Sequence, residues 1–153
     1  MTKEMEDFIG VYRVINAMGP AIDDHRWDDF AALFADDAAV HHNVLGDQIG
    51  IGNVVSGMRG IAAKRITTNY FVGNIRIFPS EGETVHAECD FHLTMLHPGE
   101  GEDPSVFTAG YRFAANSRQL HGRWRIVELT PAERWVDPGM ARFINQRKAA
   151  LKA

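Results

Sequence analysis

Residues 84–95 read TVHAECDFHLTM and alternate without a break between polar and apolar side chains. Successive side chains of a strand point to opposite faces, so this pattern predicts a strand with one buried face and one face that is wet or lies in a polar interface. Similar strand patterns cover residues 66–78, 105–115 and 123–136. The turn signals Pro-Ser-Glu-Gly, Pro-Gly-Glu-Gly and His-Gly separate the four segments, which predicts an antiparallel meander.

Helical patterns precede these strands. Apolar residues recur at three- and four-residue steps from residue 4 to 18, and Gly19-Pro20 is expected to bend or interrupt that helix. A shorter helix is expected over 27–34, closed by a turn at Asp36-Asp37. A short strand over 38–45, a glycine-rich connection and a weak helix around 54–63 complete this half.

The C-terminal segment predicts one more helix at about 138–151, with Asp137 as its cap and Pro138 in its first position. Helices first and a run of strands afterwards favour an α+β fold, in which helices pack on one face of an antiparallel sheet. The length of 153 residues fits one domain spanning 1–153.

Composition excludes several classes of function. Sixteen Lys and Arg against twenty Asp and Glu give a formal charge of −4, and no basic run is present that would favour a nucleic-acid partner. No apolar run has membrane-spanning length, and the polar N-terminus does not resemble a signal peptide. The lone Cys89 cannot form an internal disulfide, which favours a reducing, cytoplasmic location.

One family resemblance covers most of the chain. Residues 21–30, AIDDHRWDDF, followed by 33–38, LFADDA, resemble the first helix-pair signature of SnoaL-like proteins in the nuclear transport factor 2-like superfamily. Residues 68–74, TNYFVGN, then Gly110-Tyr111, and then 122–126, GRWRI, running on to Arg134-Trp135, agree with it in order and rough spacing.

This resemblance implies a cone-shaped fold, in which a strongly curved antiparallel or mixed sheet wraps the N-terminal helices and encloses a pocket. Scytalone dehydratase and related lyases, isomerases and cyclases of this superfamily use an aspartate of the first helix region with a pocket histidine, and Asp23 matches that aspartate. Tyr70 and Cys89 stand where the resemblance places histidines, and His42 stands where the dehydratase has a pocket tyrosine.

Three residues are therefore the candidate catalytic group. A carboxylate at Asp23, held in an apolar helical junction, would have its pKa raised by desolvation and would be suited to proton transfer, although an exposed helix-end acid is the alternative. His42 is preferred over His41 because neighbouring strand residues face opposite sides and the resemblance points to position 42. Tyr70 could donate a hydrogen bond to a carbonyl oxygen, or be a satisfied core tyrosine.

Six further residues are expected to line the ligand pocket, with Cys89 as a wall or core residue rather than a nucleophile because no neighbouring base is evident. They are Tyr12, Trp27, Cys89, Phe91, Tyr111 and Phe113. The polar strip from His86 to His92 is spaced too widely for its four side chains to hold one metal ion. Gly50-Ile51-Gly52 lacks the context of a dinucleotide site, so no cofactor and no metal is expected.

The sequence thus leads to a functional hypothesis: a cofactor-independent lyase or isomerase acts on a small cyclic or polyketide-like carbonyl compound, with dehydration as the preferred reaction. Asp23 and His42 would exchange protons while Tyr70 polarises the carbonyl. The alternative is a non-catalytic module of the same fold that binds a small ligand or assembles, since a fold does not determine a function. Self-association into a dimer or trimer is expected, with the outer sheet face as the contact.

Overall fold

The computed structural model describes residues 1–64, 66–98 and 105–153. Within these residues the chain forms four helices and six strands. In chain order they are α1 (Lys3–Asp23), α2 (Trp27–Ala31), β1 (Phe34–His42), β2 (Gly46–Ile49), α3 (Ile51–Ala62), β3 (Thr67–Ile77), β4 (Thr84–His97), β5 (Ser105–Leu120), β6 (Arg123–Val136) and α4 (Pro138–Lys152).

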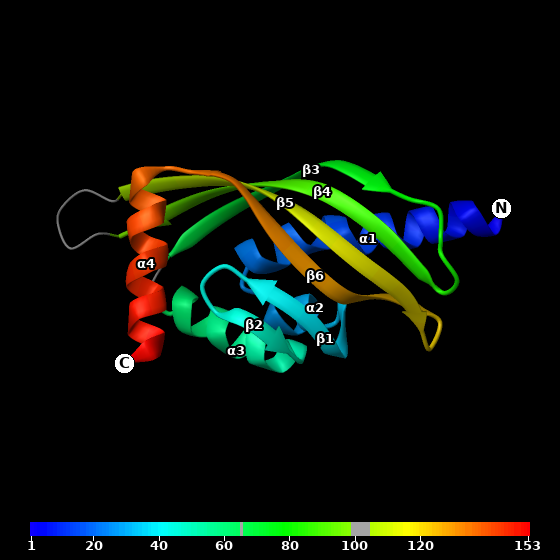
Figure 1. Ribbon diagram of the computed structural model, residues 1–153, viewed down its shortest axis with the longest axis horizontal. Helices are drawn as coiled ribbons and strands as arrows, with labels where there is room; N and C mark the ends of the chain where they lie inside the picture. Colours follow the sequence, from blue (N-terminus) through cyan, green and yellow to red (C-terminus); the bar gives the residue numbers. More distant parts are fainter. Residues whose placement is uncertain (65, 99–104) are drawn as a thin grey trace.

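The six strands form one mixed sheet in the order β2-β1-β6-β5-β4-β3, and it is open because β2 and β3 are edges. All neighbours are antiparallel except β1 and β6, which run parallel. Figure 1 shows the sheet bending around α1, while α3 lies below β1 and α4 stands across one end. The predicted α+β fold with a curved mixed sheet around N-terminal helices is therefore confirmed.

Irregularities in the strand register accompany this curvature. The pairing of β3 with β4 shifts between Gly73 and Arg76, where Asn74 has a φ of 48°. The pairing of β5 with β6 shifts between Gly110 and Tyr111, and again between Asn116 and Ser117. An extra residue in one strand increases the local twist and bends that strand, so these shifts help the long strands to curve over the helices.

Helix α1 packs its apolar stripe into the concave side of the sheet. Val11, Ile15 and Met18 are almost fully buried. At Gly10 an added Cβ would lie 2.0 Å from Cδ1 of Trp124, so only a residue without a side chain lets the indole lie against the helix. Burial of these apolar groups is the main source of stability in such a layer.

Two expectations for the helices are corrected. Helix α1 runs unbroken through Pro20 to Asp23, although Gly19-Pro20 was expected to bend or interrupt it. Gly19 packs tightly on β3, where an added Cβ would lie 3.1 Å from the Tyr70 carbonyl oxygen, and this tertiary contact holds the last turn. Helix α2 ends at Ala31 rather than residue 34, because Phe34 already pairs with Ile126 of β6.

The first strand and its partner also differ from expectation. Strand β1 begins at Phe34 and includes Asp36-Asp37, which was expected to be a turn. The glycine-rich connection contains β2, which pairs with β1 as a hairpin. Strand β5 extends five residues beyond the expected end, to Leu120, whereas β6 and α4 match their expected limits closely. The expected turn at 98–101 lies mostly outside the described residues.

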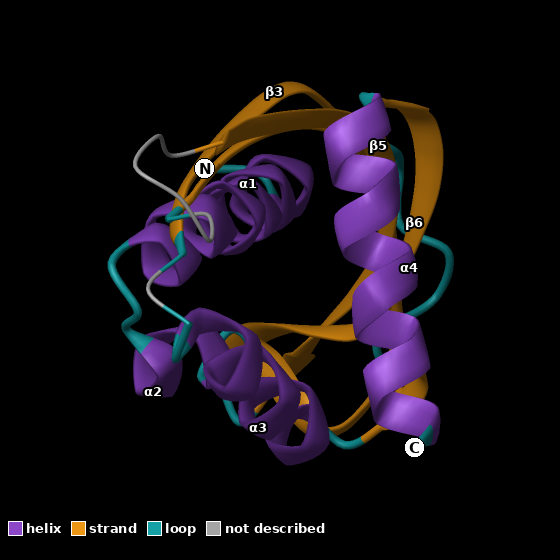
Figure 2. Ribbon diagram, turned by 90° about the vertical axis from the view of Figure 1, so that its left-hand side faces the viewer, coloured by secondary structure: helices purple, strands orange, loops and turns teal. Residues whose placement is uncertain are grey.

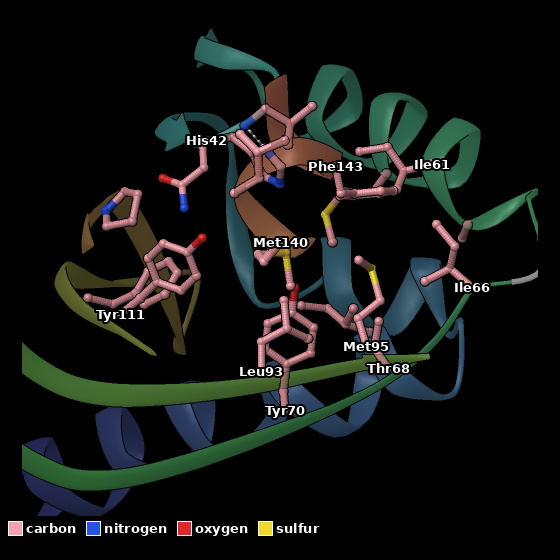
Figure 3. A pocket seen from close by; sticks show the side chains of 18 of the residues that line it. His42, Ile61, Ile66, Thr68, Tyr70, Leu93, Met95, Tyr111, Met140 and Phe143 are labelled. Atoms are coloured by element: carbon pink, nitrogen blue, oxygen red, sulfur yellow. Dashed lines mark hydrogen bonds between the residues drawn. The ribbon is translucent and has the colours of Figure 1, made fainter. Parts of the chain in front are cut away.

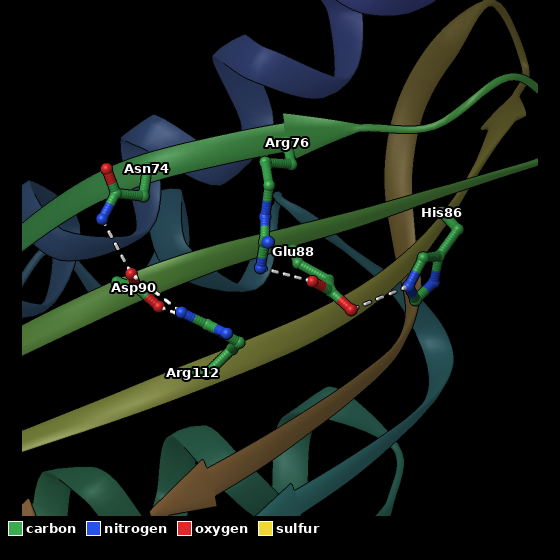
Figure 4. A network of polar contacts seen from close by, with 6 residues as sticks. All are labelled: Asn74, Arg76, His86, Glu88, Asp90 and Arg112. Carbon is green, nitrogen blue, oxygen red and sulfur yellow. Dashed lines mark hydrogen bonds and ion pairs between the residues drawn. The ribbon is translucent and has the colours of Figure 1, made fainter. Parts of the chain in front are cut away.

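The outer face of the sheet carries the polar residues of the alternating strand. Asp90 accepts hydrogen bonds from Arg112 and Asn74, each at 2.8 Å, and Glu88 pairs with Arg76 at 2.5 Å (Figure 4). The hydrogen bonds from Arg112 and then from Asn74 lower the pKa of Asp90 to about 2. The strip is therefore a set of local ion pairs that span neighbouring strands.

Helix α4 is fastened to β5 at its first turn. The Asp137 carboxylate accepts hydrogen bonds from the backbone of Met140, which caps the helix, and from the backbone and hydroxyl of Thr108. Gly139 lies against Phe107, where an added Cβ would come within 2.4 Å of the ring. Met140, Phe143 and Ile144 are buried and face the interior, so α4 closes the end of the sheet seen in Figure 2.

Candidate active site

A cavity of about 130 Å³ lies between the concave face of the sheet and the helices. Strands β3, β4 and β5 form its floor, and α3 and α4 form its walls (Figure 3). Most of the lining is apolar. The apolar residues are Ile22, Trp27, Val44, Met58, Ile61, Ala62, Ile66, Leu93, Met95, Phe113, Pro131, Met140, Phe143 and Ile144, and the polar ones are His25, His41, His42, Asn43, Thr68, Tyr70 and Tyr111.

His42 is the last residue of β1, and the turn that follows it fixes its ring. Its Nδ1 accepts hydrogen bonds from the backbone N–H groups of Val44 and Leu45, both at 3.1 Å. An N–H group can donate only to an unprotonated nitrogen, so the ring carries its proton on Nε2. Burial lowers the pKa of His42 to about 4, which keeps the imidazole neutral at pH 7. Its Nε2–H side faces the cavity (Figure 3).

Tyr70 and Tyr111 approach the cavity from the sheet. Burial is the main reason that the pKa of Tyr70 is raised well above its usual value, with the nearby Tyr111 and Asp23 adding to the shift. Burial also raises the pKa of Tyr111, although a hydrogen bond with Asn43 opposes that rise. Both phenols therefore keep their protons at neutral pH and can act as hydrogen-bond donors. Among the described residues, the Tyr70 hydroxyl has no hydrogen-bond partner.

Asp23 lies at the end of α1, directly behind the cavity wall. Its carboxylate accepts a hydrogen bond from the Thr68 hydroxyl at 2.8 Å and from the backbone N–H of Tyr70 at 3.0 Å. Thr68 lines the cavity and Asp23 does not. The hydroxyl of Thr68 thus stands between the carboxylate and any bound molecule.

His25, in the loop that joins α1 to α2, and Trp27, the first residue of α2, both line the cavity. Their rings stack with centroids 5.4 Å apart. His25 is exposed and has a φ of 54°, in the left-handed region that non-glycine residues rarely adopt. The stacked pair therefore connects the cavity wall with the surface of the protein.

Comparison with known proteins identifies the family. The model of the SnoaL-like domain matches residues 3–130, which is most of the chain. The chain belongs to the SnoaL-like family. A comparison with curated proteins finds no match for this SnoaL-like protein.

Solved structures confirm the fold of the SnoaL-like chain. A putative aromatic ring hydroxylase from Novosphingobium aromaticivorans superposes with a TM-score of 0.77 at 16% identity, covering 89% of this chain and 95% of that one. A hexachlorocyclohexane dehydrochlorinase, LinA type 2, gives 0.77 at 12% identity over 88% and 89%. A putative scytalone dehydratase from N. aromaticivorans gives 0.70 at 16% identity over 87% of each chain.

The cavity of this SnoaL-like protein brings together five of the nine residues expected at the site. These five are His42, Tyr70, Trp27, Tyr111 and Phe113. The other four lie elsewhere. Asp23 is behind Thr68, and Tyr12 is 42% exposed on α1, where it stacks on Phe8.

Cys89 and Phe91 face inward from β4, as the alternation predicted, but they lie in the packed core rather than in the cavity lining. The ring of Phe91 packs between Tyr70 and Phe113, at centroid distances of 6.0 and 4.6 Å. Burial, with a smaller effect of Asp90, raises the pKa of the Cys89 thiol to about 12. The thiol is therefore protonated at neutral pH and is not a nucleophile.

Sequence reasoning missed several cavity residues of the SnoaL-like chain. Thr68 was quoted only as part of a family motif, although its hydroxyl is the partner of Asp23. Asn43 follows His42 directly and forms a hydrogen bond with Tyr111. This contact depends on the shape of the turn after β1, which the sequence pattern does not show. Met140 and Phe143 belong to the apolar stripe of α4, whose docking partner the sequence left open.

The described part of the chain has neither a cluster of side chains that could bind a metal ion nor a helix that could span a membrane. In residues 1–64, 66–98 and 105–153, no three His, Cys, Asp or Glu side chains are grouped so that they could hold a metal ion. No helix of this described part is both long and apolar enough to cross a membrane.

Proposed function

We propose that the protein is a cofactor-independent lyase or isomerase that acts on a small cyclic carbonyl compound, with dehydration as the preferred reaction. The observation that carries this proposal is the pair of fixed donors in an apolar cavity. His42 holds its proton on Nε2, and Tyr70 lines the same cavity with a hydroxyl that forms no hydrogen bond with a described residue. Such donors suit a ligand oxygen that gains negative charge during a reaction.

The size of the cavity limits the substrate. A cavity of about 130 Å³ is close to the engineered apolar cavity of about 150 Å³ that takes up benzene. The ligand portion inside is therefore about one six-membered ring. Polar groups on that ring must be few, because most of the lining is apolar and each unpaired polar group buried there would cost free energy.

The two donors would act on the carbonyl oxygen. Removing a proton next to a carbonyl places charge on that oxygen, and fixed hydrogen bonds stabilise the resulting enolate more than the ketone. His42 suits this role because a neutral imidazole donates from Nε2 without bringing a positive charge into an apolar site. Tyr70 suits it because its hydroxyl is protonated at neutral pH.

Asp23 would accept the proton through Thr68. In this route the Thr68 oxygen takes a proton from the substrate while its own hydrogen passes to the Asp23 carboxylate, 2.8 Å away. A carboxylate held by fixed hydrogen bonds is a suitable final acceptor. For dehydration, the proton that Asp23 has accepted returns through the Thr68 hydroxyl to the departing hydroxyl group, which leaves as water.

A non-catalytic ligand-binding module of the same fold is the second candidate. It is favoured by the position of Asp23, whose carboxylate already accepts hydrogen bonds from Thr68 and Tyr70 and does not line the cavity. In that case the same donors would hold a ligand oxygen without proton transfer. The two candidates share the binding site and differ only in turnover.

Proton exchange separates the two candidates without knowledge of the natural substrate. The protein is incubated in D₂O with a panel of single-ring ketones, including cyclohexanone and 3-hydroxycyclohexanone, and the loss of α-proton signals is followed by NMR. The enzyme proposal expects exchange or elimination clearly faster than in buffer. The conservative variants Tyr70→Phe and His42→Asn should each slow that reaction at least about tenfold, the scale of losing one hydrogen-bond donor.

The outcomes differ for each candidate. Binding of a ketone to the wild type without exchange above the buffer rate would contradict the enzyme proposal and support the binding module. Exchange that is unaffected by both substitutions would show that the reaction takes place outside the cavity, and it would contradict the proposed roles of these donors.

A further inference from the structure

A second, larger cleft adjoins the ring-sized cavity. It has a volume of about 580 Å³ and lies between the β1–β2 turn and the last turns of α4. The two spaces share the residues 41–44 and Pro131 in their linings. A ligand that reaches past His42 would therefore extend from the inner cavity into this outer cleft.

Two lysines of α4 line the outer cleft. Lys148 and Lys152 are four residues apart, so they lie one above the other on the same face of the helix. Both are exposed, and within the described part of the chain neither ammonium group forms an ion pair with a carboxylate. The two lysines thus place positive charge in this cleft, although the protein as a whole carries an excess of acidic residues.

One carboxylate, that of Asp47, also lines the cleft. Its Oδ1 lies 2.7 Å from Nδ1 of His41, so it is occupied by a hydrogen bond from the β1 side of the cleft. Two lysines against one carboxylate leave the cleft with a net positive charge. The balance of charge therefore favours an anionic group over a cationic one.

The cleft has an apolar side as well. Leu151 lies between the two lysines in sequence and is 61% exposed, although it is a large apolar side chain. Val44 and Leu45 line the same space from the turn after β1. An alkyl or other apolar linker could pass along these side chains between the inner cavity and the lysines.

We propose that the outer cleft is a subsite for a carboxylate that is joined by a short linker to the ring in the inner cavity. The inference rests on the proposed function for the ring, and it narrows the substrate class to amphipathic cyclic carbonyl compounds that carry an acid group. Lys148 and Lys152 would bind the carboxylate as mobile point charges, so the linker length can vary by a few atoms. Nothing in this subsite takes part in proton transfer.

The test measures binding rather than turnover. Isothermal titration calorimetry compares 4-phenylbutanoate with its neutral analogue 4-phenylbutan-1-ol, at low and high ionic strength. The wild type should bind the carboxylate about five- to tenfold more tightly, as two exposed ion pairs would give. This preference should fall at high salt, because screening weakens exposed pairs.

Charge reversal identifies the cations. In Lys148→Glu/Lys152→Glu the preference for the carboxylate should disappear or reverse, while the alcohol should bind as before. The matched control is Arg134→Glu/Arg142→Glu, which changes the net charge equally at two exposed arginines that line neither space. The control should keep the preference. Thermal unfolding of each variant verifies that the fold is intact.

The outcomes are distinguishable from failure of the proposed function. Equal affinity for the two probes, or a preference that survives reversal of both lysines, would overturn the subsite and leave the inner cavity as proposed. Equal loss in the control would show a long-range charge effect and would also overturn it. Absence of binding by both probes would overturn the subsite together with the binding role of the inner cavity.

Discussion

The carboxylate of Asp23 accepts a hydrogen bond from the hydroxyl of Thr68, and this 2.8 Å contact joins the last turn of α1 to the beginning of β3. The backbone N–H of Tyr70 donates to the same carboxylate. A single acidic side chain therefore holds the helix against the strand that carries two cavity residues. Its structural role and its proposed chemical role can be separated by substitution.

Replacing Asp23 by Asn should abolish turnover and leave the fold nearly unchanged. The amide oxygen can still accept from the Tyr70 N–H, and the amide group can still pair with the Thr68 hydroxyl, so the free energy of unfolding should fall by no more than about 1 kcal/mol. Asp23→Ala should lose about 2 kcal/mol or more because both donors lose their acceptor. Chemical denaturation and the deuterium exchange rate measure the two effects. Near-normal turnover in Asp23→Asn would leave the residue a purely structural role.

Two substitutions of His42 should separate the role of Nδ1 in holding the turn from the proposed role of Nε2 in binding the ligand. His42→Asn places an amide oxygen near the position of Nδ1, so the N–H groups of Val44 and Leu45 keep an acceptor while the Nε2–H donor is lost. It should weaken ketone binding about fivefold or more and cost little stability. His42→Leu should lose the same affinity and in addition about 2 kcal/mol of stability. Equal ketone affinity in wild type and His42→Asn would show that Nε2 does not contact the ligand.

Stability should decrease as the pH falls from about 6.5 to about 4. In this window the unfolded chain binds a proton at position 42, since an unperturbed histidine has a pKa of about 6.5, whereas the folded protein does not until its pKa of about 4. The unfolded state thus binds more protons, and the loss amounts to at most about 3 kcal/mol.

Denaturation curves of the wild type and His42→Asn between pH 4.5 and 7.5 isolate this contribution, because the other histidines are common to both proteins. The wild type should lose more stability than the variant on acidification. Parallel curves would mean that folding does not lower the pKa of His42. The lowered pKa of Asp90 acts in a separate window, since its stabilising charge is present above about pH 4 and is lost as the pH falls toward 2.

The outer sheet face should mediate self-association. Phe71, His92, Gly110 and Trp135 are cross-strand neighbours in a row over β3, β4, β5 and β6, and Phe71 and Trp135 are 67% and 45% exposed. Exposed aromatic side chains in one row are typical of a contact surface. Light scattering should give a dimer or trimer for the wild type and a monomer for Phe71→Lys/Trp135→Lys. A monomeric wild type at about 100 μM, or an unchanged mass in the variant, would contradict this.

The fold could be predicted because its long strands carry regular patterns. The alternation in residues 84–95 predicted the position of β4 closely, because burial with a period of two is a local signal. The His121-Gly122 turn predicted the start of β6 closely, because both residues adopt the left-handed backbone conformation typical of a tight turn. Pro20 and Asp36-Asp37 misled the prediction because tertiary contacts outweighed local propensity. Gly19 packs on β3, and β1 is held by its parallel partner β6.

The site could be predicted only in part. His42, Tyr70 and Tyr111 follow from strand alternation and the family resemblance, and all three line the cavity. Whether an inward-facing residue reaches the cavity or lies in the packed core depends on the strand register and on where α4 docks. No local sequence pattern encodes either of these. For this reason Cys89 and Phe91, on the expected face of β4, lie in the packed core, and Tyr12 lies at the surface.

The central claim is that a neutral His42 and a protonated Tyr70 hold one ligand oxygen inside the cavity. A crystal structure of the protein soaked with 2-cyclohexenone tests it most directly. We predict that the ring fills the cavity with its carbonyl oxygen about 2.7–3.1 Å from both His42 Nε2 and the Tyr70 hydroxyl, the usual range for such hydrogen bonds. A ring that binds elsewhere, or a carbonyl oxygen that reaches neither donor, would contradict the account.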